Sequence, residues 1–84
     1  MKPEAIDIRI ATHGSSEYEQ EVEVRRRILR RPLGLDFSEE ELAAEHAETH
    51  IVAVADGRVV GCAVMVHKEG GVAKMRQVAV EPEL

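Results

Sequence analysis

Apolar residues follow strand-like patterns in four stretches of the chain, residues 5–11, 50–55, 58–67 and 72–80. In the first stretch Ile6, Ile8 and Ile10 alternate with polar residues, which predicts a strand with one buried face. The second and third stretches flank Asp56-Gly57, a dipeptide typical of two-residue hairpin turns. The pattern therefore predicts that the last three strands form an antiparallel meander.

Two helices are predicted between the first strand and this meander, over residues 16–31 and 38–47. Ser16 with Glu19, and Ser38 with Glu41, have the spacing of capping boxes, which mark helix N-termini. Pro32 disfavours helical backbone at the residue before it, so the first helix should end near residue 30 or 31.

The charges of the two helices are strongly ordered. Glutamates occupy the first half of the first helix and arginines its second half, with Glu21–Arg25 and Glu23–Arg27 at i,i+4 spacing. We expect the arginines of residues 25–31 to act through the helix dipole and through ion pairs, with nucleic-acid binding as the alternative. Residues 36–48 carry six acids and neither Lys nor Arg, which predicts a solvated face or, alternatively, attraction of a cationic amine.

The last strand changes the phase of its alternation. Ala73 and Met75 have one parity, whereas Val78 and Val80 have the other. A change of parity inside one strand requires an extra residue, so we expect a β-bulge near residues 76–77, with the ladder broken between Met75 and Val78.

Both faces of the strand over 58–67 are apolar or small. Val59, Gly61, Ala63 and Met65 alternate with valines and Cys62, and a strand of this kind is covered on both sides in folded proteins. Two helices joined by a short connector cover one face, so we expect something else to cover the second.

Composition excludes several classes of function. The 84 residues allow one domain with a small core. A net charge of −5 and aromatic residues limited to one Tyr and one Phe argue against nucleic-acid binding. No apolar run has membrane-spanning or signal-peptide length, and Cys62 has no second cysteine to pair with. We therefore expect a soluble cytoplasmic protein in which Cys62 is a small core residue.

The order of elements, β-α-α-β-β-β, is the order in which the Gcn5-related N-acetyltransferase (GNAT) fold begins. Residues 25–42 resemble the helix–loop–helix of small bacterial members, residues 51–65 resemble the second and third strands, and the bulged segment 72–82 resembles the fourth. The resemblance implies an α+β fold in which residues 1–84 form a single partial GNAT domain, ending before the loop that binds the pyrophosphate of CoA.

The resemblance also implies a function, transfer of acetyl from acetyl-CoA to an amine. In GNAT proteins the first helix borders the acceptor groove, so a further alternative for the arginines of residues 25–31 is contact with an acidic acceptor. The backbone amides and carbonyls around Val78, Ala79 and Val80 would then bind the acetyl carbonyl and the pantetheine arm. Because the family holds much of CoA through its pyrophosphate loop, we expect this chain alone to bind acetyl-CoA weakly or not at all, and to be inactive.

The sequence does not identify a catalytic residue. Some GNAT members use a carboxylate of the third or fourth strand as general base, but here the fourth strand offers Arg76 and Gln77, followed by Glu81 beyond the bulge. In many family members a Tyr acts as general acid, and by the resemblance this Tyr would lie outside residues 1–84.

The four histidines do not predict a metal site. His46 and His50 are four residues apart, a zinc-like spacing on one helix, but a strand is predicted to begin at His50. His13, in a loop, and His67, at a strand end, are expected to be exposed.

Two non-enzymatic interpretations stand beside the acetyltransferase. One is a small α+β interaction or dimerisation module, and the other is an acidic regulatory domain. The apolar second face and the open edge of the last strand predict a homodimer, formed through residues 72–80 or through the uncovered sheet face.

Overall fold

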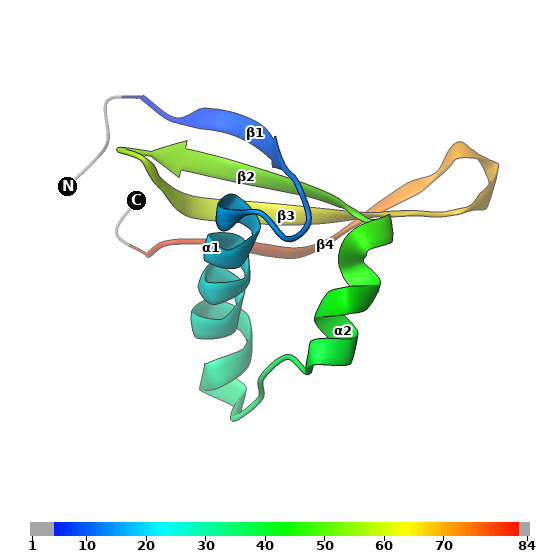
Figure 1. Cartoon of the computed structure of the whole chain (residues 1–84), viewed down its shortest axis with the longest axis horizontal. Coiled ribbons are helices and arrows are strands. Elements are labelled where there is room, and N and C mark those ends of the chain that lie inside the picture. The colour runs from blue at the N-terminus through cyan, green and yellow to red at the C-terminus, as the bar shows by residue number, and fades with distance from the viewer. Residues whose placement is uncertain (1–4, 83–84) are drawn as a thin grey trace.

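The computed structural model describes residues 5–82 and has the predicted α+β architecture, a four-stranded antiparallel sheet with two helices (Figure 1). The strands are β1 (Asp7–Ala11), β2 (Thr49–Ala55), β3 (Arg58–His67) and β4 (Ala73–Val80). The helices are α1 (Ser16–Arg25) and α2 (Glu39–Ala44). All six elements were predicted, with bounds that differ by only a few residues except at the end of the first helix.

The strands lie in the sheet in chain order, β1-β2-β3-β4, so β1 and β4 are its edges. Both helices lie on the same side of the sheet (Figure 1). The β2–β3 turn is formed by Asp56 and Gly57, both with positive φ (52° and 77°). Two positive φ values are those of a type I′ turn, whose twist matches the flanking strands, so the predicted hairpin is confirmed.

The first helix begins at the predicted residue with a different cap. The predicted Ser16–Glu19 capping box is wrong: Ser15 is the N-cap, and its hydroxyl accepts a hydrogen bond from the Tyr18 amide at 3.2 Å. Ser15 and Ser16 carry the same capping side chain, so the sequence does not distinguish them. Ser15 is the N-cap because its backbone is extended.

Beyond Arg25 the helix changes type instead of ending. A π-helical turn, η1 (Arg26–Arg30), is followed by a 3-10 turn, η2 (Arg31–Leu33), which Gly34 closes with a φ of 73°. The helix that begins at Ser16 thus runs to Arg30, the end predicted before Pro32. Pro32 lies in the first turn of the new 3-10 segment, where a backbone N–H would have no helical partner in any case. The Ser38–Glu41 capping box of α2 is confirmed, with both of its hydrogen bonds present.

The core lies between α1 and the sheet. It contains the apolar side chains of Ala11, Val24, Val52, Val54, Val59, Cys62 and Ala79, with Ile28 and Leu29 packed against them. Cys62 is buried in this cluster, as predicted.

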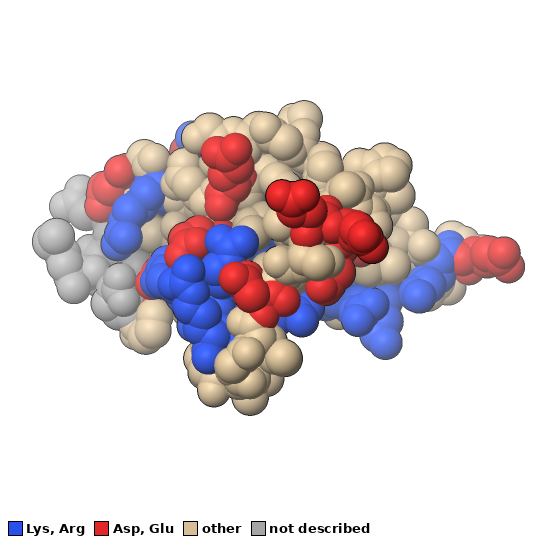
Figure 2. All heavy atoms as spheres, turned by 60° about the horizontal axis from the view of Figure 1, so that its bottom comes forward, with Lys and Arg blue, Asp and Glu red and all other residues tan. Residues whose placement is uncertain are grey.

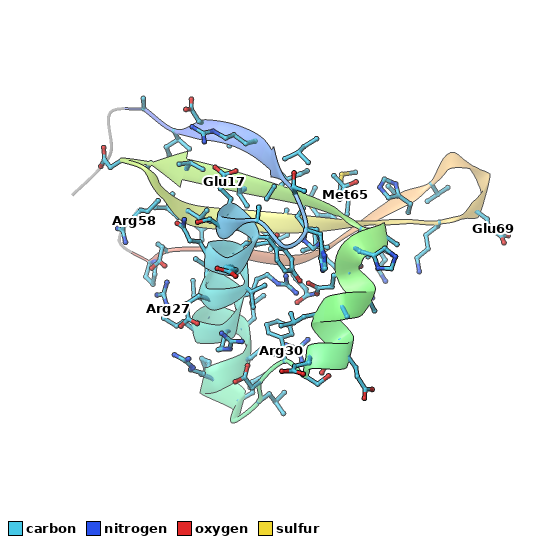
Figure 3. The ribbon with its side chains drawn as sticks, viewed as in Figure 1. Glu17, Arg27, Arg30, Arg58, Met65 and Glu69 are labelled. Carbon is cyan, nitrogen blue, oxygen red and sulfur yellow. The ribbon has the colours of Figure 1, made fainter. Side chains whose placement is uncertain are left out.

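On the opposite side of the sheet, which we call the open face, none of residues 5–82 forms a covering helix (Figure 1). Its rows follow from the strand pairing: Ile8, Ala53, Gly61 and Val80 form one row, Ile10, Ile51 and Ala63 the next, and Met65 pairs with Met75. Ile8 and Ile10 are 68% and 72% exposed. In Figure 3, Met65 points away from the helices. The prediction that the helices cover one of two apolar faces is confirmed.

The predicted bulge in β4 is confirmed. Arg76 pairs with Val64 and Ala79 pairs with Cys62, so Gln77 and Val78 together oppose the single residue Ala63. Gln77 has a φ of 50°, in the left-handed region. One type of β-bulge has its first residue in this conformation. The turn sends the Gln77 side chain toward the helices, where the candidate site lies.

Candidate functional site: a buried ion cluster below an open cleft

Arg25 is the centre of a buried polar cluster between α1, the segment after α2, and the β4 bulge. Its guanidinium makes five hydrogen bonds to three residues: Nε and Nη2 donate to Gln77 Oε1 at 3.2 and 2.9 Å, and Nη1 donates to Glu21 Oε2 at 3.3 Å. Nη1 also donates to Glu45 Oε1 at 3.0 Å, and Nη2 donates to Glu45 Oε2. Every N–H of the guanidinium therefore has an acceptor, although the side chain is fully buried.

Glu45 joins α2 to this cluster. It lies in the 3-10 turn η3 (Glu45–Ala47) and is buried. Besides the two bonds from Arg25, its Oε1 accepts from the Tyr18 hydroxyl at 2.6 Å. Burial alone would raise the pKa of Glu45, but the hydrogen bonds from Arg25 and Tyr18 outweigh it and lower the pKa. The carboxylate is therefore ionised, and it is a poor proton acceptor for an ammonium group.

Glu21 connects Arg25 to His50 on β2. His50 Nε2 lies 3.0 Å from the Glu45 carbonyl oxygen, and Nδ1 lies 3.0 Å from Glu21 Oε2. A carbonyl and a carboxylate only accept, so both ring nitrogens must carry protons, which makes His50 an imidazolium. Burial disfavours this charge, yet the bonds to Glu21 and Glu45 outweigh burial and raise the pKa of His50.

The cluster is electrically balanced, since Glu21 and Glu45 match Arg25 and His50. Within residues 5–82, no buried side-chain nitrogen or oxygen lacks a hydrogen-bond partner. Complete pairing is what allows four charges to be buried together. The cluster thus holds α1, η3, β2 and the β4 bulge in one arrangement.

One expectation about these helices is confirmed and one needs correction. The Glu21–Arg25 ion pair is present, and it is buried, whereas Glu45, expected on a solvated acidic face, is buried too. The other arginines of the stretch do reach the surface, where Arg26 pairs with Asp36 at 2.6 Å. Figure 2 shows the two signs of charge interspersed over the helices, with no broad field of one sign.

A signal for Arg25 was present in the sequence. It lies seven residues after Tyr18, three after Val22 and four before Leu29, so it occupies the apolar stripe of α1. A charged residue inside such a stripe predicts a buried partner, and the i,i+4 carboxylate of Glu21 was one candidate. The contribution of Glu45 had no comparable signal, because it comes from a different helix.

The cluster forms the inner end of a cleft of about 420 Å³ between the two helices and β4. The cleft is lined by Arg30, Phe37, Glu41, Ala44, Glu45, Glu48, Arg76 and Gln77. Two guanidinium groups make cation–π contacts with the Phe37 ring. The Cζ atoms of Arg30 and Arg25 lie 4.3 and 4.7 Å from the ring centre. In Figure 3, Arg30 lies in the gap between α1 and α2.

The residues predicted to bind acetyl-CoA follow the bulge directly. Ala79 is buried in the core, and the side chains of Val78 and Val80 are about half exposed, Val80 in the open face. Their backbone belongs to an edge strand. On the core side, the Cys62 thiol donates to the Gln77 carbonyl oxygen at 3.7 Å. Only Gln77 and Arg76 of this strand line the cleft.

Glu81, whose direction the sequence left open, points back to α1. Its carboxylate accepts two hydrogen bonds from Arg27, one of them at 3.3 Å, and is 4% exposed. These bonds lower the pKa of Glu81. The ion pair fastens the end of β4 to the helix, and it places this carboxylate outside the cleft.

The histidines are distributed differently from the prediction at one position. His67 is exposed, but His13 is half-buried, with Nε2 2.8 Å from the Leu42 carbonyl oxygen and its ring 4.6 Å from that of Tyr18. His46 is exposed while His50 is buried in the cluster. Within residues 5–82, no group of three His, Cys, Asp or Glu side chains has the arrangement of a metal site.

None of the helices in the described part of the chain is long and apolar enough to cross a membrane. Comparison with known protein families, with curated proteins and with solved structures found no match for this chain.

Proposed function

We propose that this chain is the N-terminal half of an acyl-CoA N-acyltransferase of the GNAT type, acting in the cytoplasm, and that it supplies the strand that binds the thioester and the cleft that binds the acceptor. The observation that carries the proposal is the β4 bulge at Gln77–Val78. Its first residue, Gln77, lines a cleft together with Arg76, α2 and the α1–α2 connector. A bulge frees backbone groups from the ladder, and a cleft of this volume is within the range of small-molecule sites.

In this proposal the thioester lies along β4, with the backbone of Val78, Ala79 and Val80 holding the acetyl carbonyl and the pantetheine arm. The acceptor amine lies in the cleft. Its nitrogen, after losing a proton to solvent, attacks the thioester carbonyl carbon. The C–N bond forms, the C–S bond breaks, and the amine nitrogen gives up a further proton, which ends on the leaving sulfur, so that CoA leaves as the thiol. Backbone amides stabilise the oxyanion that develops on the carbonyl oxygen.

The ion cluster supports this arrangement structurally and does not act as the base. Arg25 holds Gln77 through two hydrogen bonds, and Gln77 is the residue whose left-handed backbone forms the bulge. Glu45 is already committed to Arg25 and Tyr18. The assignment of a general base to any residue of this chain is therefore not part of the proposal.

The test uses S-acetyl-pantetheine, which contains the reacting group and lacks the CoA pyrophosphate. Titrated into the ¹⁵N-labelled chain, it should shift the amide resonances of residues 77–80 with a dissociation constant on the order of 1 mM or weaker. Acetyl-CoA should bind with similar weakness, and measurable acetyl transfer by this chain is not expected. Shifts confined to β1 and β2, or no shifts at millimolar ligand, would overturn the site. Micromolar binding of acetyl-CoA would contradict the expected weakness.

A second candidate function is dimerisation through the open face, with a second copy of this chain as the partner. The specific observation is the area and composition of that face. Its half-exposed apolar side chains, together with Val78, present on the order of 600 Å², close to the roughly 800 Å² per partner of a standard interface and at the upper limit for a monomer. The paired rows contain no charged residue, so a two-fold contact between identical faces would bury no unpaired charge.

Replacing Val78 with Lys tests this candidate, because a charge would then be buried in the contact. Light scattering should show a dimer for the native chain and a monomer for Val78→Lys. Leu35→Lys, in the exposed α1–α2 connector, is the control and should remain dimeric. A native chain that is monomeric at micromolar concentration would rule the dimer out.

A further inference from the structure

The cleft has two walls of opposite charge. Glu41 lies in α2, Glu45 in η3, and Glu48 directly after η3, where the backbone is extended, while Arg30 and Arg76 extend from η1 and β4. Glu41 and Glu45, four residues apart on consecutive helical turns, and Glu48 beyond them all line the cleft. A ligand in the cleft therefore meets carboxylates on one side and guanidinium groups on the other.

Only some of these charges are already paired. Glu45 is engaged by Arg25 and Tyr18, and Arg30 stacks on Phe37 and lies 4.0 Å from Glu41. Among residues 5–82, the side chains of Glu48 and Arg76 have no hydrogen-bond or ion-pair partner. Two charges of opposite sign thus remain available in the same cleft.

Gln77 adds a neutral group between them and the ion cluster. Its Oε1 is taken by two bonds from Arg25, but its Nε2 reaches only Glu45 Oε2, at a long 3.5 Å. The amide can therefore donate a better bond to a ligand. The guanidinium groups of Arg25 and Arg30 lie over the Phe37 ring, so a ligand beside this ring also meets positive charge.

We propose that the cleft binds a small zwitterionic amine, a free amino acid or dipeptide, which on the proposed function is the acyl acceptor. The carboxylate of the ligand pairs with Arg76, whose planar guanidinium suits it, and the ammonium pairs with Glu48 on the acidic wall. A ligand with a single charge leaves one of these two side chains unpaired in the cleft, and so binds less well. The volume of about 420 Å³ fits a molecule of this size.

Three dipeptides test the proposal by removing one charge at a time. Ala-Ala has both charges, Ala-Ala amide lacks the carboxylate, and N-acetyl-Ala-Ala lacks the ammonium. In ¹⁵N NMR titrations of the whole chain, Ala-Ala should shift the amides near residues 48, 76 and 77. It should bind at least roughly tenfold more tightly than either analogue, since one charged contact amounts to about that factor.

Variants connect each charge to its side chain. Arg76→Gln should abolish the preference for Ala-Ala over Ala-Ala amide, and Glu48→Gln should abolish the preference over N-acetyl-Ala-Ala. Lys74→Gln is the matched control, because Lys74 lies on the same strand two residues away and does not line the cleft. It should leave all three affinities unchanged. Both cleft variants alter partly or fully exposed side chains, and unchanged urea midpoints will verify that they fold.

Two results would overturn the proposal. One is equal affinity for the three dipeptides. The other is the absence of shifts near the cleft at roughly 10 mM Ala-Ala, which corresponds to less than about 3 kcal/mol of binding free energy. The two proposals fail separately. Binding of S-acetyl-pantetheine to β4 without zwitterion selectivity overturns this inference alone. Zwitterion selectivity without thioester binding supports the amino-acid site and removes the acyltransferase function.

Discussion

Replacing Arg25 with Met should strongly destabilise the fold. The substitution keeps most of the side-chain volume and removes the charge, leaving Glu21 and Glu45 buried with His50 as the remaining cation. Five hydrogen bonds are lost, and Gln77 Oε1 loses both of its donors. Removing one member of a buried ion pair costs about 3–5 kcal/mol, a large part of the total stability of a small domain.

The neighbouring arginine provides the control. Arg26 lies on the same helix and also has two carboxylate partners, Glu23 at 2.8 Å and Asp36 at 2.6 Å, but these partners are exposed. Exposed ion pairs contribute about 0–1 kcal/mol, so Arg26→Met should cost at most that. The two variants thus differ mainly in whether the ion pairs are buried.

Urea unfolding followed by far-UV circular dichroism measures the difference. With a slope of roughly 1–2 kcal/mol per M at this size, the midpoint of Arg25→Met should fall by about 2 M or more, and that of Arg26→Met by less than about 1 M. If Arg25→Met lacks a folded baseline, all three chains are compared in the presence of an excluded osmolyte. Equal losses for the two variants would refute the conclusion that the buried cluster holds the fold together.

Three further predictions concern pH, the bulge and the thiol. The pKa of His50 is raised, so its contribution to stability is complete below the ordinary histidine pKa and is lost as pH rises through the raised pKa. The pKa of Glu45 is lowered, so its contribution to stability is lost as pH falls through the lowered pKa. Urea midpoints should therefore fall on both sides of a maximum in the mildly acidic range, and His50→Gln should remove the alkaline fall. Gln77→Val should be about 1 kcal/mol less stable than Gln77→Ala in the same assay, because a β-branched residue resists the φ of 50°; equal midpoints would contradict the left-handed backbone. Burial raises the pKa of Cys62 to about 12, so a thiol reagent at neutral pH should react with it only at the rate of unfolding, and immediate reaction with the folded chain would show that the thiol is accessible.

Local patterns in the sequence were sufficient for the elements and for one detail of the site. Alternation predicted the strands, Asp56-Gly57 predicted the turn, and the change of parity after Met75 predicted the bulge that Gln77 forms. Each of these features depends on residues that are close together in the chain. The side-chain period of a strand and the φ preference of a turn act at that range, so the sequence alone determines them.

The ion cluster could be decided only by the tertiary structure. Glu21–Arg25 and Glu23–Arg27 have the same spacing and the same residue types, yet the first pair is fully buried and the second is exposed. The difference arises because α1 packs one face on the sheet, and because Glu45 from η3 and Gln77 from β4 supply the partners that Arg25 needs there. A charge is stable in the interior only when partners from distant segments surround it, and no local pattern specifies where those segments meet.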